Sequence, residues 1–196
     1  MKRRLFSLGT CILMAACGGV PLRSLPRLMQ LPEQLLEANP AEFRVALQVD
    51  ARLVPPAGAV PFLIIKVAPR TAGEFEIIDK RLALQLSVAS VSTLGLEAPP
   101  RGRRWLVYSM PPQTQLELQR VQETIRQSRA KSQTLPTGKG GGSLSVGLEQ
   151  DSLATSDPAL AGSRWDTWLQ THQSDGFFEV WSGTLAQLKK IAAEKK

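Results

Sequence analysis

Apolar and polar side chains alternate along much of the chain, which is the pattern of β-strands with one buried face. The clearest example is segment 43–53, where apolar side chains occupy every second position: Phe43, Val45, Leu47, Val49, Ala51 and Leu53. Further strands are predicted at 62–67, 75–78, 82–88, 105–110 and 144–148. Proline and glycine separate several of these segments, so the pattern predicts a mainly β domain with short turns.

One segment, 112–133, changes to the helical period. Thr114 and Glu117 have the spacing of a capping box, which satisfies the first free backbone amides of a helix. A single apolar stripe then falls on one face: Leu118, Val121 and Ile125. The spacing predicts a surface helix that ends near Lys131.

Segment 165–172 fits two structures. Some of its side chains have helical spacing: Trp165, Trp168, Leu169 and His172. Its threonines and the turn residues Asp175-Gly176 instead suit a β-hairpin with 177–181, and we favour the hairpin.

The remaining segments complete the predicted architecture. The glycine-rich segment 134–142 is expected to be a flexible loop, and Thr184 and Gln187 have capping-box spacing before a short C-terminal helix. Together these elements predict one antiparallel β-sandwich-like domain over residues 43–196. Its inserted surface helix and C-terminal helix bring it to the margin of the α+β class.

The first sixteen residues have the layout of a bacterial export signal. Lys2, Arg3 and Arg4 form a positive start, and residues 5–16 follow as an uncharged, mostly apolar run of twelve. A helix of twelve residues is about 18 Å long, too short for a hydrocarbon core of about 30 Å. A retained transmembrane anchor is therefore not expected.

The residues that follow, Leu13-Met14-Ala15-Ala16-Cys17, resemble the lipobox of bacterial lipoproteins. In that family small residues precede a cysteine that is acylated and becomes the new N-terminus, and Met14 replaces the usual leucine. The resemblance implies that Cys17 is the lipidation site. Because Gly18 follows it instead of aspartate, the resemblance to enterobacterial lipoproteins also implies release toward the outer membrane.

The cysteine count favours acylation over ordinary signal-peptide cleavage, for example after Gly18. Cys11 lies inside the apolar run and would be removed with the signal, so Cys17 would be the only cysteine of the exported chain. A lone cysteine cannot form an internal disulfide in an oxidising compartment. Acylation accounts for its presence.

Segment 17–42 is predicted to be a proline-rich tether that starts at the lipidated cysteine. Its prolines are spaced so that no long helix is expected, although 33–38 has room for one or two turns: Pro21, Pro26, Pro32 and Pro40. Its leucines are expected to pack against the domain. The less favoured alternative is membrane contact, with Arg23 and Arg27 facing anionic lipid.

Composition and charge add little specific chemistry. Removing residues 1–16 takes away three positive charges and no negative one, so the formal net charge falls from +7 to +4. The exported chain then has one histidine, His172, and one cysteine that is predicted to be acylated. Zinc sites need clustered cysteine, histidine and carboxylate ligands, so a transition-metal centre is not expected. A calcium site made of carboxylates alone stays an alternative, but the chain has no patterned acidic loop, and no metal or other cofactor is predicted.

No catalytic residues are predicted. A Ser-His-Asp site would need His172 as the base with Asp166 or Asp175 to orient it, and the chain has no Gly-x-Ser-x-Gly nucleophile turn. A nucleic-acid partner is not expected for an exported domain of modest charge.

The densest aromatic cluster is the candidate binding surface: Trp165, Trp168, Phe177, Phe178 and Trp181. In a β-sandwich alternate rings fill the core, and core packing is the favoured interpretation. Flat rings with polar neighbours also bind sugars or anchor protein interfaces.

These patterns predict a non-catalytic lipoprotein anchored by its acyl chains to the periplasmic face of the bacterial outer membrane. We expect it to bind or help assemble other cell-envelope components through an envelope protein partner. The alternative is a carrier or receptor for a small apolar or glycan ligand. An envelope hydrolase that uses carboxylates alone ranks below both.

The lipidation site can be tested by substitution. A Cys17→Ser variant is expected to lose labelling by radioactive fatty acid and to leave the membrane fraction, because the thiol that carries the acyl chains is gone. A Cys11→Ser variant serves as the control and should keep both properties. Unchanged labelling of the Cys17→Ser variant would show that the resemblance to a lipobox is misleading.

Overall fold

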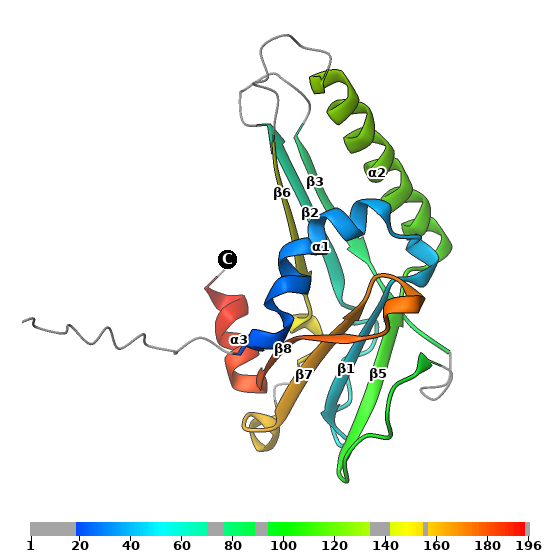
Figure 1. The fold of residues 1–196 in the computed structure, drawn as a ribbon. Coiled ribbons are helices and arrows are strands. Elements are labelled where there is room, and N and C mark those ends of the chain that lie inside the picture. Colours follow the sequence, from blue (N-terminus) through cyan, green and yellow to red (C-terminus); the bar gives the residue numbers. More distant parts are fainter. Residues whose placement is uncertain (1–18, 70–76, 89–93, 134–141, 155–156, 195–196) are drawn as a thin grey trace, which may run out of the picture.

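Two antiparallel sheets and three α-helices make up the part of the chain that the computed structural model describes, residues 19–69, 77–88, 94–133, 142–154 and 157–194 (Figure 1). The strands are β1 Arg44–Asp50, β2 Phe62–Pro69, β3 Ile78–Ala83, β4 Gln85–Leu86, β5 Arg103–Ser109, β6 Gly142–Glu149, β7 Arg164–Gln170 and β8 Phe178–Thr184. The helices are α1 Leu25–Glu37, α2 Pro112–Gln133 and α3 Leu185–Ala193.

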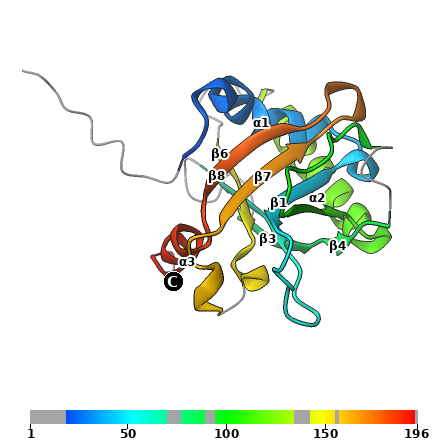
Figure 2. The ribbon, with the colours of Figure 1, turned by 90° about the horizontal axis from the view of Figure 1, so that it is seen from below.

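The strand order is β4-β5-β1-β7-β8 in the first sheet, sheet A, and β3-β2-β6 in the second, sheet B. Strand β1 is the centre of sheet A, and it pairs along its length with β5 and along Arg44 to Gln48 with β7. Helix α1 packs against β6 and α2, helix α2 packs against β3, and helix α3 packs against β8. Figure 2 shows the same arrangement from below, with α3 beside the end of β8.

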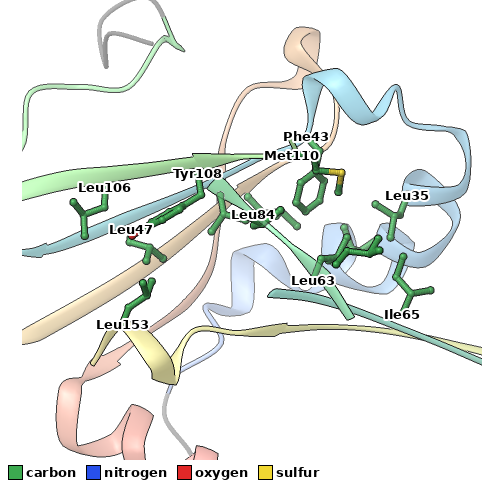
Figure 3. Packing of buried hydrophobic residues seen from close by; sticks show 14 of the residues in the cluster. Leu35, Phe43, Leu47, Leu63, Ile65, Leu84, Leu106, Tyr108, Met110 and Leu153 are labelled. Atoms are coloured by element: carbon green, nitrogen blue, oxygen red, sulfur yellow. The ribbon is translucent and has the colours of Figure 1, made fainter. Parts of the chain in front are cut away.

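The core collects the buried face of both sheets and one side of each helix. On β1 the alternate side chains Val45, Leu47 and Val49 are fully buried, and β2 contributes Leu63, Ile65 and Val67 in the same way. Figure 3 shows the buried side chains of the two sheets and of α1 packed together, with Phe43 and Leu84 among them. The apolar residues that alternate in the sequence are thus the ones whose side chains face the core.

The predicted fold class is confirmed: two antiparallel sheets form a mainly β, sandwich-like domain with an inserted helix and a C-terminal helix. The predicted hairpin is confirmed as well, because β7 and β8 pair from Arg164–Thr184 to Leu169–Phe178. The predicted capping box before α3 is present, with the Thr184 hydroxyl and the Gln187 side chain each accepting a backbone N–H. The predicted loop at 134–142 lies, except for its last residue, outside the described residues.

Two predicted boundaries are wrong. The expected strand at 82–88 is divided between β3, which pairs with β2 in sheet B, and the two residues of β4, which pair with β5 in sheet A, so the chain passes from one sheet to the other at Leu84. The expected capping box at Thr114 does not form. Helix α2 begins at Pro112, and the Thr114 hydroxyl instead donates to the Ala83 carbonyl at 3.0 Å, which joins the helix to the end of β3.

The prediction of a proline-rich tether without a long helix is wrong for residues 25–42. Helix α1 runs through Pro32, and the short 3-10 helix η2 (Pro40–Glu42) follows it. Pro26 lies in the first turn, where its missing N–H has no helical partner to lose. Pro32 costs about 3 kcal/mol inside a helix, but the three leucines that α1 buries contribute about 1.5–3 kcal/mol each: Leu31, Leu35 and Leu36. Tertiary burial therefore outweighs the local cost of proline.

Helix α2 also holds the end of α1. The buried Gln122 amide donates to the carbonyl oxygens of Leu35 and Ala38 at 2.8 and 2.9 Å, and these are carbonyls that a helix end leaves without partners. Glu33 and Arg129 form two hydrogen bonds between the same helices. Helix α1 is thus an integral part of the domain.

A matched pair of substitutions tests whether α1 belongs to the domain. Leu35 is 1% exposed and Met29 is 82% exposed on the same helix. Leu35→Ala is expected to lower the free energy of unfolding by about 2–5 kcal/mol, because it leaves a cavity. Met29→Ala should change it by less than about 0.5 kcal/mol. Equal effects in urea denaturation would show that α1 does not pack as described.

Candidate functional site

Sheet A has a second face, opposite the core, that carries polar and aromatic side chains. We call it the outer face of sheet A and define it by alternate residues of its three central strands: Arg44, Ala46, Gln48 and Asp50 of β1; Arg103, Trp105, Val107 and Ser109 of β5; and Asp166, Trp168 and Gln170 of β7. The register sets these residues side by side across the three strands.

Trp105 and Trp168 form the apolar centre of this face. They lie on the strands either side of β1, and their rings meet edge to face with centroids 6.1 Å apart. The residue of β1 that pairs with Trp168 is Ala46, which is fully buried, and its small side chain leaves room for two indoles to meet over the strand. Both indoles remain half-buried.

The two indole N–H groups differ. Trp105 donates to the Glu97 carbonyl at 2.9 Å, so the chain around Glu97 runs beside its ring. The Trp168 N–H has no hydrogen-bond partner among the described residues.

The five aromatic residues predicted as a binding surface are divided between the two faces of sheet A. Trp165 is 1% exposed and Phe178 is 8% exposed, and both belong to the core, against which the half-buried Trp181 also packs. Phe177 precedes β8 and is half-buried. Of the five, the structure places Trp168 on the outer face, where its neighbour is Trp105.

Trp105 was missed as a site residue by the sequence analysis. Its strand alternates so that Leu106, Tyr108 and Met110 are buried, and this period assigns Trp105 and Val107 to the other face. The period could have placed Trp105 away from the core. Its contact with Trp168 depends on the strand order, which the period does not contain.

Beside the tryptophans, the buried carboxylate of Asp166 gathers donors from three strands. Arg103 Nη1 on β5 donates to it at 2.6 Å, Arg164 Nε on β7 at 2.9 Å and the Ser182 hydroxyl on β8 at 2.5 Å. Arg103 Nη1 also donates to the Gln48 side chain on β1 at 2.6 Å. The network therefore joins β5, β1, β7 and β8.

Burial by itself would raise the pKa of Asp166, because it disfavours the charged form. The hydrogen bonds from Ser182, Arg103 and Arg164 and the charge of Arg103 outweigh that cost, so the pKa lies below its ordinary value. Asp166 is thus an ionised structural carboxylate. It forms ion pairs with Arg103 and Arg164 and is not suited to exchange a proton near neutral pH.

The described chain starts against the edge of the same sheet. The Ser182 N–H donates to the Gly19 carbonyl at 3.0 Å, and Arg23 pairs with the buried carboxylate of Glu179 at 2.6 Å. Strand β8 is the edge strand of sheet A, so these contacts attach the chain start to that edge. Cys17 lies outside the described residues.

A hollow of about 440 Å³ lies beside the C-terminal helix α3. Its apolar lining comes from β6 and α3: Leu148, Leu188, Ile191 and Ala192. Arg81 and Glu149 line it as well and bond to each other at 2.8 Å.

The two aspartates considered for a hydrolytic site are engaged in other bonds. Asp166 is committed to the network above, and the Asp175 carboxylate accepts the Ser174 hydroxyl. Within the described ranges, no three histidine, cysteine or acidic side chains gather as a metal site would require. Those ranges also contain no helix with the length and apolar character to cross a membrane.

Comparison with family models, with curated proteins and with solved structures finds no match to this chain.

The Asp166 network can be tested by removing its charge. Asp166→Asn leaves Arg103 without its ionic partner in a buried site and is expected to cost about 3–5 kcal/mol of unfolding free energy. As a control, Asp79→Asn removes an exposed pair with Lys66 and should cost at most about 1 kcal/mol. A cost for Asp166→Asn no greater than that of the control would contradict the role of the network.

The pH dependence has a defined sign. The pKa of Asp166 is below 3.8 when folded, so its stabilisation is complete above pH 3.8 and is lost as the pH falls through the folded pKa. The difference in unfolding free energy between wild type and Asp166→Asn should therefore shrink below pH 3.8. Denaturant titrations at several pH values measure it, and a difference that stayed constant through this window would contradict the assignment.

Proposed function

We propose that this protein is a non-catalytic, lipid-anchored module of the bacterial cell envelope that binds or helps assemble an envelope protein partner through the outer face of sheet A. Anchorage rests on the resemblance of the Leu13–Cys17 segment to a lipobox. Binding rests on one observation, the half-buried pair of Trp105 and Trp168 at the centre of that face.

Two features of the face support a protein partner. Tryptophan is enriched among the residues that dominate binding energy at interfaces, typically at the centre of a polar rim. The two carboxylates of the face are already paired within the protein, since Asp166 pairs with Arg103 and Arg164, and Asp50 pairs with Arg52; the Arg44 guanidinium donates to the backbone carbonyls of Ala41 and Phe43. The partner would therefore bring apolar and hydrogen-bonding groups more than opposite charge.

The proposal includes no catalytic role. The hydroxyl and carboxylate that meet near this face, Ser182 and Asp166, bond to each other and to Arg164. An acid that is kept ionised by arginines is suited to holding strands together, not to general acid–base catalysis.

The proposed location is the periplasmic face of the outer membrane. It follows from the lipobox resemblance and from Gly18, which replaces the aspartate that retains enterobacterial lipoproteins in the inner membrane. Acyl chains on Cys17 would provide the attachment.

The second candidate, a carrier or receptor for a small apolar or glycan ligand, is supported by the hollow beside α3. Its volume of about 440 Å³ falls within the range of small-molecule sites, and Leu188 and Ile191 supply apolar lining. Recovery of a lipid or sugar from the purified protein would favour this candidate. If an Ile191→Glu variant that still folds no longer carried that lipid or sugar, the ligand would be located in the hollow.

Site-specific crosslinking in intact cells tests the partner site. A photoreactive phenylalanine analogue at position 105 is expected to capture a defined envelope protein, because this position lies at the centre of the outer face. The same analogue at Ser145, an exposed position on β6 of sheet B, is the matched control and should not capture it.

A second arm removes the tryptophans. In this arm the photoreactive analogue is placed at a neighbouring position such as Ser109, and Trp168→Ala is introduced in the same chain. Capture is expected to fall about 10-fold or more, because truncation of a residue that dominates binding costs more than about 1.4 kcal/mol of binding free energy. Circular dichroism and urea denaturation control for folding. Equal capture from positions 105 and 145, or capture unaffected by Trp168→Ala, would contradict the proposed binding face.

A further inference from the structure

We infer that the exposed apolar side of α1 and the residues before it rest in the interface of the lipid bilayer that holds the acyl chains of Cys17. We call this surface the N-terminal stripe and define it by Val20, Leu22, Leu25 and Met29. The inference rests on the proposed lipid anchor and deepens it, because it states how the domain is seated on the membrane.

The stripe is a second apolar side of an element that already buries one side. Leu22 lies in the 3-10 turn Leu22–Ser24 that leads directly into α1, and Leu25 and Met29 follow it at intervals of three and four residues, which places the three side chains on one side of this helical segment. Leu22 is 83% exposed, Met29 is 82% exposed and Leu25 is 42% exposed, while Leu31 and Leu35 of the same helix are in the core. Packing within the domain therefore does not account for the stripe.

The attachment at Gly19 restricts what can cover the stripe. The Gly19 carbonyl is bonded to Ser182, and only Gly18 separates Gly19 from Cys17. Two steps of 3.8 Å between successive Cα atoms place the Cα of Cys17 within about 8 Å of that of Gly19. Acyl chains on Cys17 would thus hold the bilayer surface next to the chain segment that carries the stripe.

The chemistry of the stripe suits the membrane interface. Leucine and methionine side chains on one side of a helix bury into the boundary between headgroups and acyl chains. Arg23 and Arg27 of the same segment are held toward β8, where Arg23 pairs with Glu179 and the Arg27 guanidinium lies 5.4 Å from the centre of the Phe178 ring. Neither interaction occupies the stripe.

Helix α3 adds positive charge on the same side of the molecule. It begins at Leu185, three residues after Ser182, and both views show it on the side where α1 begins (Figure 1, Figure 2). Its Lys189 and Lys190 side chains are exposed. Lysines near a bilayer surface attract anionic headgroups, which complements the apolar contact.

The test uses the full lipidated protein, reconstituted in vesicles of phosphatidylethanolamine and phosphatidylglycerol. Single cysteines are introduced by Leu25→Cys and Met29→Cys and labelled with an environment-sensitive fluorophore. Gln30→Cys, exposed on the same helix but turned away from the stripe, and Val54→Cys, 71% exposed after β1, are the matched controls. Mass spectrometry of the N-terminal residue establishes whether Cys17 is acylated.

Labels at positions 25 and 29 are expected to show blue-shifted emission and a several-fold smaller quenching constant with aqueous iodide than the label at position 54. The label at position 30 should resemble the one at 54. Equal quenching at all four positions in an acylated protein would overturn the docking inference and leave the lipid anchor standing.

Two other outcomes would also overturn it. A chain without acyl groups on Cys17 would remove both the anchor and the docking that rests on it. Shielding of positions 25 and 29 only in native membranes, and not in protein-free vesicles, would assign the stripe to a protein partner.

Discussion

The carboxylate of Asp166 is buried in sheet A at the point where four strands and the start of the chain meet. Burying a carboxylate is costly unless charged donors surround it, and here Arg103, Arg164 and Ser182 supply them. Ser182 uses its hydroxyl for Asp166 and its backbone N–H for Gly19. The same residue thus connects the interior of the sheet to the first described residue of the chain.

This connection changes how the proposed anchor would work. A tether of about 25 residues would let the domain move as far as about 85 Å from the membrane. Gly19 is bonded to β8, and in the sequence only Gly18 stands between Gly19 and Cys17. Trp105 lies on β5, three strands from the β8 edge, or about 15 Å at the usual spacing between strands. A partner bound at the tryptophan pair would accordingly be held close to the bilayer.

Helix α1 shows why this arrangement could not be predicted from local rules. Its four nearby prolines, at positions 21, 26, 32 and 40, indicated an extended segment, and helix propensity supports that interpretation. The segment is nevertheless helical, because burial of Leu31, Leu35 and Leu36 contributes more free energy than Pro32 costs in a helix. Gln122 in addition donates to the carbonyls at the end of the helix. The polar partner of this helix end lies more than 80 positions away in the sequence.

The sequence by itself determined strands β1, β2, β5 and β6, the β7–β8 hairpin, the two predicted helices and the cap at Thr184, because periodicity and capping are local properties of consecutive residues. It also separated the faces of β5, so that Trp105 could be placed away from the core. Only the tertiary structure decided that Trp105 meets Trp168, that Asp166 is paired and that the chain start joins β8. Each of these contacts depends on strand order and on residues distant in sequence, which no local pattern records.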